Sequence, residues 1–312
     1  MTLTELRYLV NLDRERHFGR AAERSFVSQP TLSVAIKKLE DELGVTLFER
    51  VRGEVKPTPI GLRIVQQARH VLAEAKLIKD LAQEGQDELA GPLRFGAIYT
   101  VGPYLLPYLV PRLRKLAPAM PLVIEENFTA RLLEQLRDNE IDVACLALPV
   151  EGQGLRVWPL YDEEFVVGLP LDHPWAQEEQ IPAARISEQP LLMLGPGHCF
   201  RDQVIEACPK CVEPENEGPQ PQTGSSLETI RYMVAGGLGI TVLPRSSIGR
   251  REQQDALVIA RPFAPQAPSR RIALVWRKTY PRERAIQVLR KAIIKCPLQG
   301  VAFLADAEPQ DQ

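Results

Sequence analysis

Residues 25–50 read SFVSQPTLSVAIKKLEDELGVTLFER, a run that carries the start and stop signals of one helix. Ser28 is a suitable N-cap, and Pro30 is tolerated in the first turn, where a helix has backbone N–H groups without internal partners. Apolar residues then recur at helical spacing as far as Leu43. Gly44 is a natural stop, so the run predicts a helix that ends just before it.

A shorter, alanine-rich helix is predicted immediately before this one, over residues 17–25. Two helices joined by a three-residue turn form a helix-turn-helix. No acidic residue occurs between Arg24 and Leu39, which favours placing the second helix against DNA. The expected contacts to base edges are Gln29, Pro30, Thr31 and Ser33, and the expected contacts to phosphates are Lys37, Arg50 and Arg52.

The segments on either side extend this DNA-binding pattern. At the start of the chain, Thr2 and Glu5 fit a capping box. After Gly44, basic residues around a central glycine are typical of a small β-hairpin wing that touches a phosphate strand.

Thr58 and a following proline then predict a long helix, about 45 Å for about 30 residues. One helix cannot bury its apolar stripe alone, so pairing with a second subunit is expected, which also supplies two DNA half-sites.

From residue 91 onward the pattern changes to alternating strands and helices. Runs such as LRFGAIYT, PLVIEENF and IDVACLALPV predict strands, and the alternation predicts an α/β domain with mainly parallel strands. Binding crevices in such sheets lie at the carboxyl ends of the strands, where the loop over residues 98–103 projects. Residues 209–224 are predicted to be an exposed loop, and the tail after residue 305 is predicted to be disordered.

The composition is that of a globular protein with two or three domains, since 45% of the 312 residues are hydrophobic and 25% are charged. The net charge of −2 gives no general signal for nucleic acid. Neither a signal peptide nor an apolar run of about 20 residues is seen, so we expect the cytoplasm and no membrane. Five cysteines there do not predict a structural disulfide framework, and any disulfide is expected to be transient or regulatory.

The helix-turn-helix run, followed by TPIG at the start of the long helix, resembles the LysR-type transcriptional regulators, and the resemblance covers essentially the whole chain. It implies an effector domain built like a periplasmic binding protein, with two α/β subdomains joined by crossover strands near residues 161–164 and 269–271. The predicted fold class is therefore α+β multidomain. Its expected parts are a winged helix-turn-helix (1–58), a linker and dimerisation helix (59–90), subdomain I (91–162 plus 270–305) and subdomain II with a redox switch (163–269).

Two further runs, GHCFRDQVIEAC and SSLETIRYMVAGGLGITVLP, resemble the peroxide-sensing members of that family. The resemblance implies that Cys199 and Cys208 form a reversible redox pair. A helix beginning at Cys199 would favour its thiolate, which attacks peroxide to give a sulfenic acid that Cys208 can condense with. Nine helical residues rise about 13.5 Å, whereas a disulfide needs Cα atoms within about 7 Å. Bond formation is therefore expected to unwind or move that helix.

The same resemblance implies a peroxide pocket around Cys199. Hydroxyl groups are expected from Thr100 and Thr129, polar groups from Asp202 and Arg271, and positive potential or hydrogen bonds from His198 and Arg201.

Cys211 departs from the family pattern, because Cys208-Pro209-Lys210-Cys211 is a C-x-x-C. Either Cys211 competes as the resolving partner, or it forms a disulfide with Cys208. Two cysteines alone make a poor zinc site, and no metal or cofactor is expected.

These patterns predict a DNA-binding regulator, not an enzyme, that senses hydrogen peroxide and controls oxidative-stress genes. The implied partners are a double-stranded DNA operator, further copies of the chain as a dimer and a tetramer, RNA polymerase and a thiol system that resets the switch. One alternative is a regulator that responds to a small molecule held between the effector subdomains. Another is a thiol enzyme that uses the C-x-x-C, which the helix-turn-helix disfavours.

Overall fold

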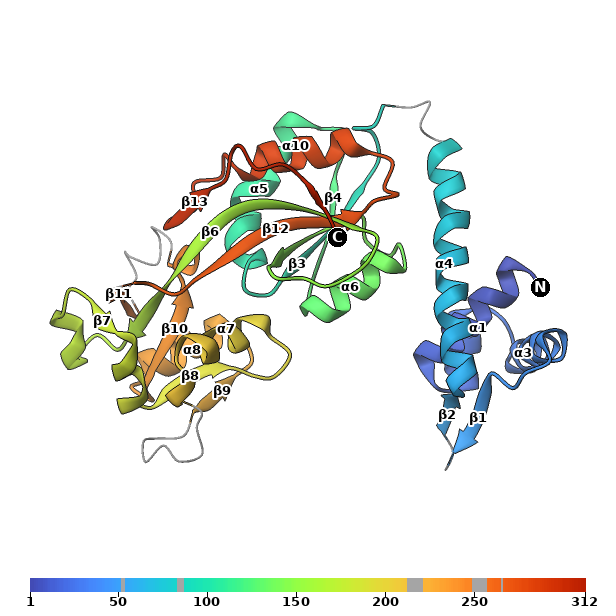
Figure 1. Ribbon diagram of the computed structural model, residues 1–312, viewed down its shortest axis with the longest axis horizontal. Helices are drawn as coiled ribbons and strands as arrows, with labels where there is room; N and C mark the ends of the chain where they lie inside the picture. Colours follow the sequence, from blue (N-terminus) through green and yellow to red (C-terminus); the bar gives the residue numbers. More distant parts are fainter. Residues whose placement is uncertain (52–53, 83–86, 212–220, 249–256, 265) are drawn as a thin grey trace. The chain divides into compact units, whose positions relative to one another are not determined.

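The computed structural model describes residues 1–51, 54–82, 87–211, 221–248, 257–264 and 266–312, which form two compact units (Figure 1). The first unit is a helix-turn-helix domain with a wing and a long helix. Its elements are α1 (Leu3–Glu15), α2 (Phe18–Arg24), α3 (Gln29–Leu43), β1 (Phe48–Val51), β2 (Glu54–Pro57) and α4 (Pro59–Ala82).

The predicted helix signals of the first unit are confirmed. Thr2 and Glu5 form the capping box of α1, and the N–H of Thr31 donates to Oγ of Ser28 at the start of α3. Gly44 follows α3 with φ of 68°, in the left-handed region that glycine adopts at little cost. The helices enclose a core of leucines from α1 and α3, and β1 pairs antiparallel with β2 as the predicted wing.

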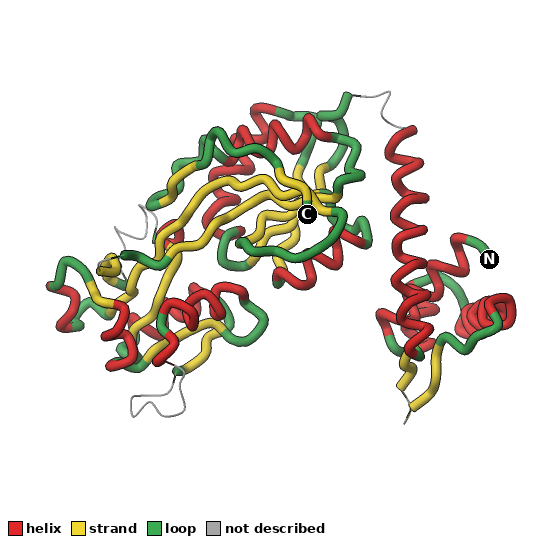
Figure 2. Tube along the Cα trace, viewed as in Figure 1, coloured by secondary structure: helices red, strands yellow, loops and turns green. Residues whose placement is uncertain are grey.

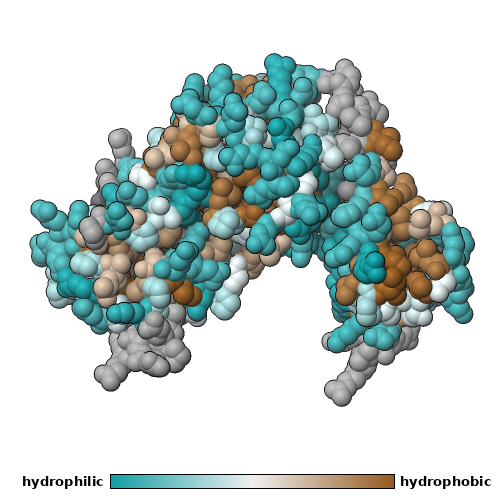
Figure 3. Space-filling model, viewed as in Figure 1, coloured by the Kyte–Doolittle hydropathy of each residue, from teal (hydrophilic) through white to brown (hydrophobic). Residues whose placement is uncertain are grey.

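The long helix α4 has a buried face and an exposed apolar face. Val65 and Ala68 are buried against the core of the first unit. Further along, Val71 is exposed and the side chain of Ile78 is 68% exposed. Hydrophobic side chains are visible along α4 in Figure 3. Such a stripe is the physical reason to expect a second subunit, and that pairing stays a prediction.

The second unit contains the effector region, a mixed sheet flanked by helices (Figure 2). Its strands are β3 (Leu93–Ile98), β4 (Leu122–Asn127), β5 (Val143–Ala147), β6 (Leu155–Leu169), β7 (Ile181–Pro182), β8 (Leu191–Leu194), β9 (Gln222–Gly224), β10 (Ile240–Pro244), β11 (Ile259–Ala264), β12 (Ser269–Arg277), β13 (Val301–Phe303) and β14 (Gln310–Asp311). Its helices are α5 (Gly102–Leu116), α6 (Thr129–Arg137), α7 (Cys199–Ala207), α8 (Leu227–Ala235) and α10 (Glu283–Ile293), with 3-10 turns η1 (Pro174–Gln177), η2 (Ala183–Glu188), η3 (Pro209–Cys211) and η4 (Arg245–Ser247).

Strands β6 and β12 join two halves of the second unit, each with its own core. The main sheet path runs β4-β3-β5-β12-β6-β10-β8-β9. Residues 155–164 of β6 pair with β12, whereas residues 165–169 pair with β10 and β11. One core is centred on Phe95 and Leu274, and the other on Phe165 and Leu192. The segments expected as crossovers lie in β6 and β12, while the domain boundaries given above stay predictions.

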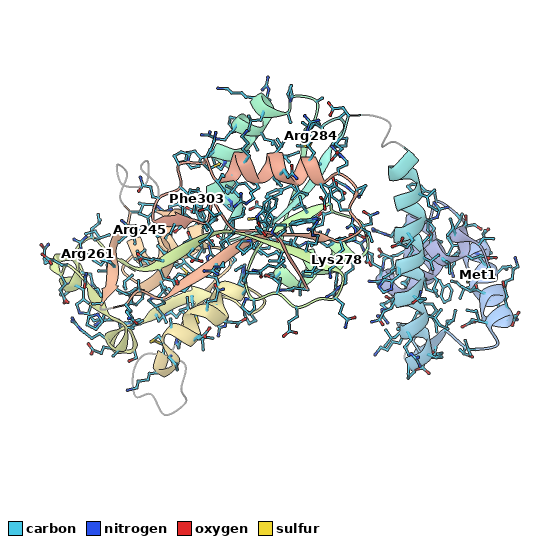
Figure 4. The ribbon with its side chains drawn as sticks, turned by 45° about the horizontal axis from the view of Figure 1, so that its top comes forward. Met1, Arg245, Arg261, Lys278, Arg284 and Phe303 are labelled. Carbon is cyan, nitrogen blue, oxygen red and sulfur yellow. A yellow bond between two sulfur atoms is a disulfide. The ribbon has the colours of Figure 1, made fainter. Side chains whose placement is uncertain are left out.

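Three expectations about the second unit are wrong. The sheet is mixed rather than mainly parallel, because β12 and β6 run antiparallel to their neighbours. Strand β9 lies within the segment expected to be a loop, where it pairs with β8. The tail is ordered, because β14 pairs with β6 and Nε1 of Trp158 donates to the carbonyl of Ala307 at 2.6 Å. Just before the tail, Phe303 (Figure 4) packs edge-on against Tyr161, with ring centres 5.6 Å apart.

The junction between the wing and α4 is tightly packed at Gly61. A methyl group at this position would lie 2.1 Å from the carbonyl oxygen of Leu47, a backbone atom that also accepts the N–H of Thr58. Alanine is preferred to glycine in a helix by about 1 kcal/mol, but overpacking against backbone costs about 1–3 kcal/mol. We expect Gly61→Ala to lower the free energy of unfolding of the first unit, measured by denaturant titration. Gln66→Ala, at an exposed site on α4, is the control, and equal stability of the two variants would contradict the prediction.

Candidate functional site

A small hollow lies at the carboxyl ends of β3 and β4, where parallel strands bring their following loops together. Its volume is about 180 Å³, including the solvent at its mouth. The lining residues come from three segments: Ile98, Tyr99 and Thr100 after β3, Asn127, Phe128 and Thr129 after β4, and Gly197, His198 and Cys199 at the start of α7. Two segments from one half of the unit therefore meet one segment from the other half.

Cys199 is the first residue of α7, which contacts β8 in the second core. Its thiol is free and partly exposed, and the partial positive charge of the helix N-terminus lies beside it. Oγ1 of Thr129 is buried and has no hydrogen-bond partner within the described part of the chain. An unpartnered hydroxyl beside a thiol is an available hydrogen-bonding group for a small polar ligand.

The aromatic wall of the hollow is formed by Tyr99, Phe128 and His198, whose rings pack edge-on with centres 4.8–5.8 Å apart. Burial lowers the pKa of His198, so the neutral imidazole is favoured. Of the two contributions expected from His198, positive potential or hydrogen bonds, the lowered pKa favours the neutral form that can hydrogen-bond, and His198 lies in the wall of the hollow.

A buried cation that the sequence interpretation missed, Arg270 of β12, contacts the lining residue Thr100. Its Nη1 donates to Oγ1 of Thr100 at 2.8 Å, its Nη2 donates to the carbonyl of Thr100, and its Nε donates to Glu163 at 2.7 Å. Both side chains of the ion pair are fully buried. Burial opposes the charge of Arg270, but the negative charges of Glu163 and of groups including Cys199 outweigh it and raise the pKa of the guanidinium.

Arg271, which was expected in the pocket, lies on the other face of β12. It pairs with Asp162 at 2.7 Å, and its side chain is 49% exposed. Successive residues of a strand point to opposite faces, so only one of the two adjacent arginines can face the core. No local signal separates the two arginines, because residues 272–276 are all buried and the face of Arg270 is fixed by register with β6.

Two other predicted pocket residues also lie outside the lining. Nη1 of Arg201 donates to the carbonyl of Leu194 at 2.9 Å, and Asp202 is exposed in the first turn of α7. Thr100, Thr129 and His198 are the predicted residues that the structure brings together with Cys199.

Cys208 is bonded to Cys211 rather than to Cys199, with Cα atoms 5.7 Å apart. This is one of the two alternatives that the C-x-x-C left open. Of the other cysteines, Cys145 and Cys296 are buried free thiols, and burial raises the pKa of Cys145 to about 12 and of Cys296 to about 11. Both therefore remain in the less reactive thiol form.

The predicted DNA-contact residues of the first unit lie mainly on α3. Gln29, Pro30, Thr31 and Lys37 are exposed and Ser33 is half-buried. Arg50 lies in β1, and Arg52 lies outside the described residues. Over the described ranges, no group of three metal-ligating side chains could hold an ion. Within those same ranges, none of the helices has the length and apolarity to cross a membrane.

Comparison with known families defines the class of protein. Residues 3–62 match the bacterial regulatory helix-turn-helix of the lysR family, and residues 86–295 match the LysR substrate binding domain. A helix-turn-helix unit and an effector unit with a hollow between its halves are thus combined in one chain.

The most similar relatives define the group within that class. A hydrogen peroxide-inducible genes activator of Pectobacterium carotovorum is 43% identical over 90% of this chain and 92% of its own. The dual regulator OxyR of Escherichia coli is 42% identical over 94% of this chain and 95% of its own. Full-length OxyR of Pseudomonas aeruginosa, a cysteine-to-aspartate variant, is 50% identical with a TM-score of 0.76, covering 97% of this chain and 98% of its own. The chain belongs to the OxyR group of the LysR family.

Two neighbouring cross-strand ion pairs allow a matched test of the site. Register places Arg270 opposite Glu163 in the buried interior and Arg271 opposite Asp162 at the surface. Breaking a buried pair leaves an uncompensated charge and costs about 3–5 kcal/mol, whereas exposed pairs contribute about 0–1 kcal/mol. We expect Glu163→Gln to lower the free energy of unfolding of the effector unit by several times more than Asp162→Asn. Calorimetry of the full chain measures both, and similar losses would contradict this account of the buried pair.

Proposed function

We propose that this protein is a transcriptional regulator whose binding to a DNA operator changes when hydrogen peroxide oxidises Cys199. The observation that carries the proposal is the partly exposed Cys199 thiol, at the N-terminus of α7, in a small hollow with Thr129 and beside the buried cation of Arg270. The names of the relatives support it, and one similar structure, OxyR of Corynebacterium glutamicum, is a hydrogen peroxide-bound cysteine-to-serine mutant, 34% identical with a TM-score of 0.63, covering 94% of this chain and 92% of its own.

The first chemical step follows from the groups around the hollow. The Cys199 thiolate attacks one peroxide oxygen, the O–O bond breaks, and hydroxide leaves as the sulfenic acid forms. The buried guanidinium of Arg270 holds Thr100 in the lining of the hollow, and the free hydroxyl of Thr129 is available to bind the peroxide. The hydroxyl and the carbonyl of Thr100 both accept hydrogen bonds from Arg270, and these bonds fix the position of the guanidinium.

The second step converts oxidation into a structural change. Cys208 condenses with the sulfenic acid, water leaves, and a Cys199–Cys208 disulfide forms. Cys199 is the first residue of α7 and Cys208 is its C-cap, so the bond requires that α7 unwind or move. We further propose that a dimer or tetramer transmits this change to the DNA-binding units, that RNA polymerase is the downstream partner, and that a cytoplasmic thiol system restores the reduced state.

The alternative of a small-molecule effector is less well supported. The hollow leaves only water-sized space for a bound molecule, whereas pockets for drug-sized ligands usually have volumes of about 300–1,000 Å³. A thiol enzyme is also less well supported, because Cys208 and Cys211 are both buried and a substrate would have to reach them. A regulator needs only one oxidation for each switching event, so catalytic turnover is not part of the proposal.

The proposed sensing residue is tested by its response to peroxide. Peroxide is expected to change the operator footprint of the wild-type chain, and Cys199→Ser is expected to abolish the change while leaving the reduced footprint intact. Cys296→Ser, which alters a buried thiol outside the lining of the hollow, is the control and should respond normally. A fully responsive Cys199→Ser variant would falsify the proposal.

The DNA-binding face offers a second matched test on α3. Lys37 is exposed, whereas Nζ of its neighbour Lys38 donates to Glu5 at 3.0 Å, and this hydrogen bond lowers the pKa of Glu5. A lysine that neutralises one phosphate contributes about 0.9 to the slope of log affinity against log salt. We expect Lys37→Ala to reduce that slope by about one and Lys38→Ala to reduce it far less. Equal changes in titrations at several salt concentrations would count against Lys37 as the phosphate contact.

A further inference from the structure

Cys208 can belong to either of two disulfides, and the structure contains only one of them. Its bond to Cys211 spans Cα atoms 5.7 Å apart, while Cys199 remains a free thiol. The bond to Cys199 belongs to the proposed function and spans the full length of α7. Because one sulfur cannot form both bonds at once, the two disulfides exclude each other.

The two disulfides differ in what they require of α7. Helical geometry separates residues 199 and 208 by about 13.5 Å, about twice the distance that a disulfide permits. The Cys208–Cys211 bond leaves α7 intact, since the N–H of Cys208 still donates to the carbonyl of Val204 at 3.0 Å. The N–H of Cys211 donates to the carbonyl of Cys208 at 3.1 Å, so the backbone turn itself holds the pair together.

The two cysteines also differ from Cys199 in their surroundings. Cys208 and Cys211 are 6% and 3% exposed and belong to the same core, whereas Cys199 lines the solvent-open hollow. A thiol held in the same turn as Cys208 is at a far higher effective concentration than any dissolved thiol. Attack on a disulfide by a neighbouring thiolate is the ordinary route of disulfide exchange.

We propose that Cys211 is a second resolving thiol, which displaces Cys199 from Cys208 and makes the Cys208–Cys211 disulfide the end product of oxidation. The proposal rests on the proposed function, because Cys199 must first be oxidised and bonded to Cys208. In the added step the Cys211 thiol loses its proton and attacks Sγ of Cys208. The Cys199–Cys208 bond breaks, its electron pair leaves on Cys199, and Cys199 takes up a proton.

Together, the three reaction steps need no oxidant other than hydrogen peroxide. One peroxide is reduced to two waters, and the thiols of Cys208 and Cys211 are oxidised to one disulfide. Cys199 returns to its starting state, and α7 can re-form. The conformational signal is therefore limited in time by the protein itself, while a reductant is still required to recover Cys208 for a second signal.

The order in which the two disulfides form is tested by stopping the reaction of the whole chain with peroxide at successive times. The reduced protein receives one equivalent of hydrogen peroxide, free thiols are blocked with iodoacetamide, and disulfides are mapped by mass spectrometry. In the wild type the 199–208 linkage should rise and then give way to 208–211, with Cys199 again alkylated. In Cys211→Ser the 199–208 linkage should persist about ten-fold longer or more. Cys211→Ala, as a second variant, should agree, and Cys296→Ser should follow the wild type.

Operator footprinting on the same samples provides an independent readout. The wild-type footprint should return toward the reduced pattern without added reductant, whereas that of Cys211→Ser should remain oxidised.

Three results would contradict the exchange step, and they differ in what they imply for the proposed function. If 199–208 is the lasting product in the wild type and in Cys211→Ser alike, the exchange step is wrong and the proposed function stands. If Cys199→Ser forms 208–211 at the wild-type rate, that bond arises by direct oxidation and the exchange is again wrong. If Cys199 is not oxidised in any variant, both the proposed function and the exchange fail.

Discussion

The guanidinium of Arg270 is fully enclosed, and its contacts tie together several parts of the effector unit. It donates to Glu163 on the neighbouring strand and to both oxygens of Thr100, while Glu163 accepts the backbone N–H of Ser246. Moving ions out of water costs several kcal/mol for each ion. The buried pair offsets this cost because its donors and acceptors are directed at one another. The consequence is a cation fixed beside Cys199 by the fold itself.

The same contacts connect the ion pair to α7. The guanidinium lies 5.1 Å from the ring centre of Phe200, which in turn packs edge-on against Phe165 at 5.0 Å. Phe200 follows Cys199 directly in the first turn of α7. The proposed movement of α7, which would bring Cys199 toward Cys208, would therefore remove an aromatic ring from above a buried charge. Phe200 is thus one side chain through which the proposed oxidation would alter the packing beside the ion pair.

Local rules predicted the first unit well, whereas the site depended on long-range pairing. The capping residues Thr2, Ser28 and Thr58 act within one turn, so their helices can be found from neighbouring sequence alone. The choice between Arg270 and Arg271 depends on which face of β12 is buried, and this is fixed by register with β6. The order of the tail likewise depends on a partner strand more than 100 residues away in sequence, which no local pattern records.

The length of α7 is the remaining constraint on the switch. A nine-residue helix is short enough that its stability comes from packing rather than from its own hydrogen bonds, so its loss is within the range that a new disulfide can offset. A helix one turn shorter would still keep the thiols apart, but it would bury less of the core. A much longer helix would hold its structure against the disulfide and prevent the bond. Cys211 lies just beyond the end of α7, and its disulfide with Cys208 leaves the helix intact. Because the Cys199–Cys208 disulfide would require the helix to unwind or move, the proposed exchange favours the Cys208–Cys211 bond.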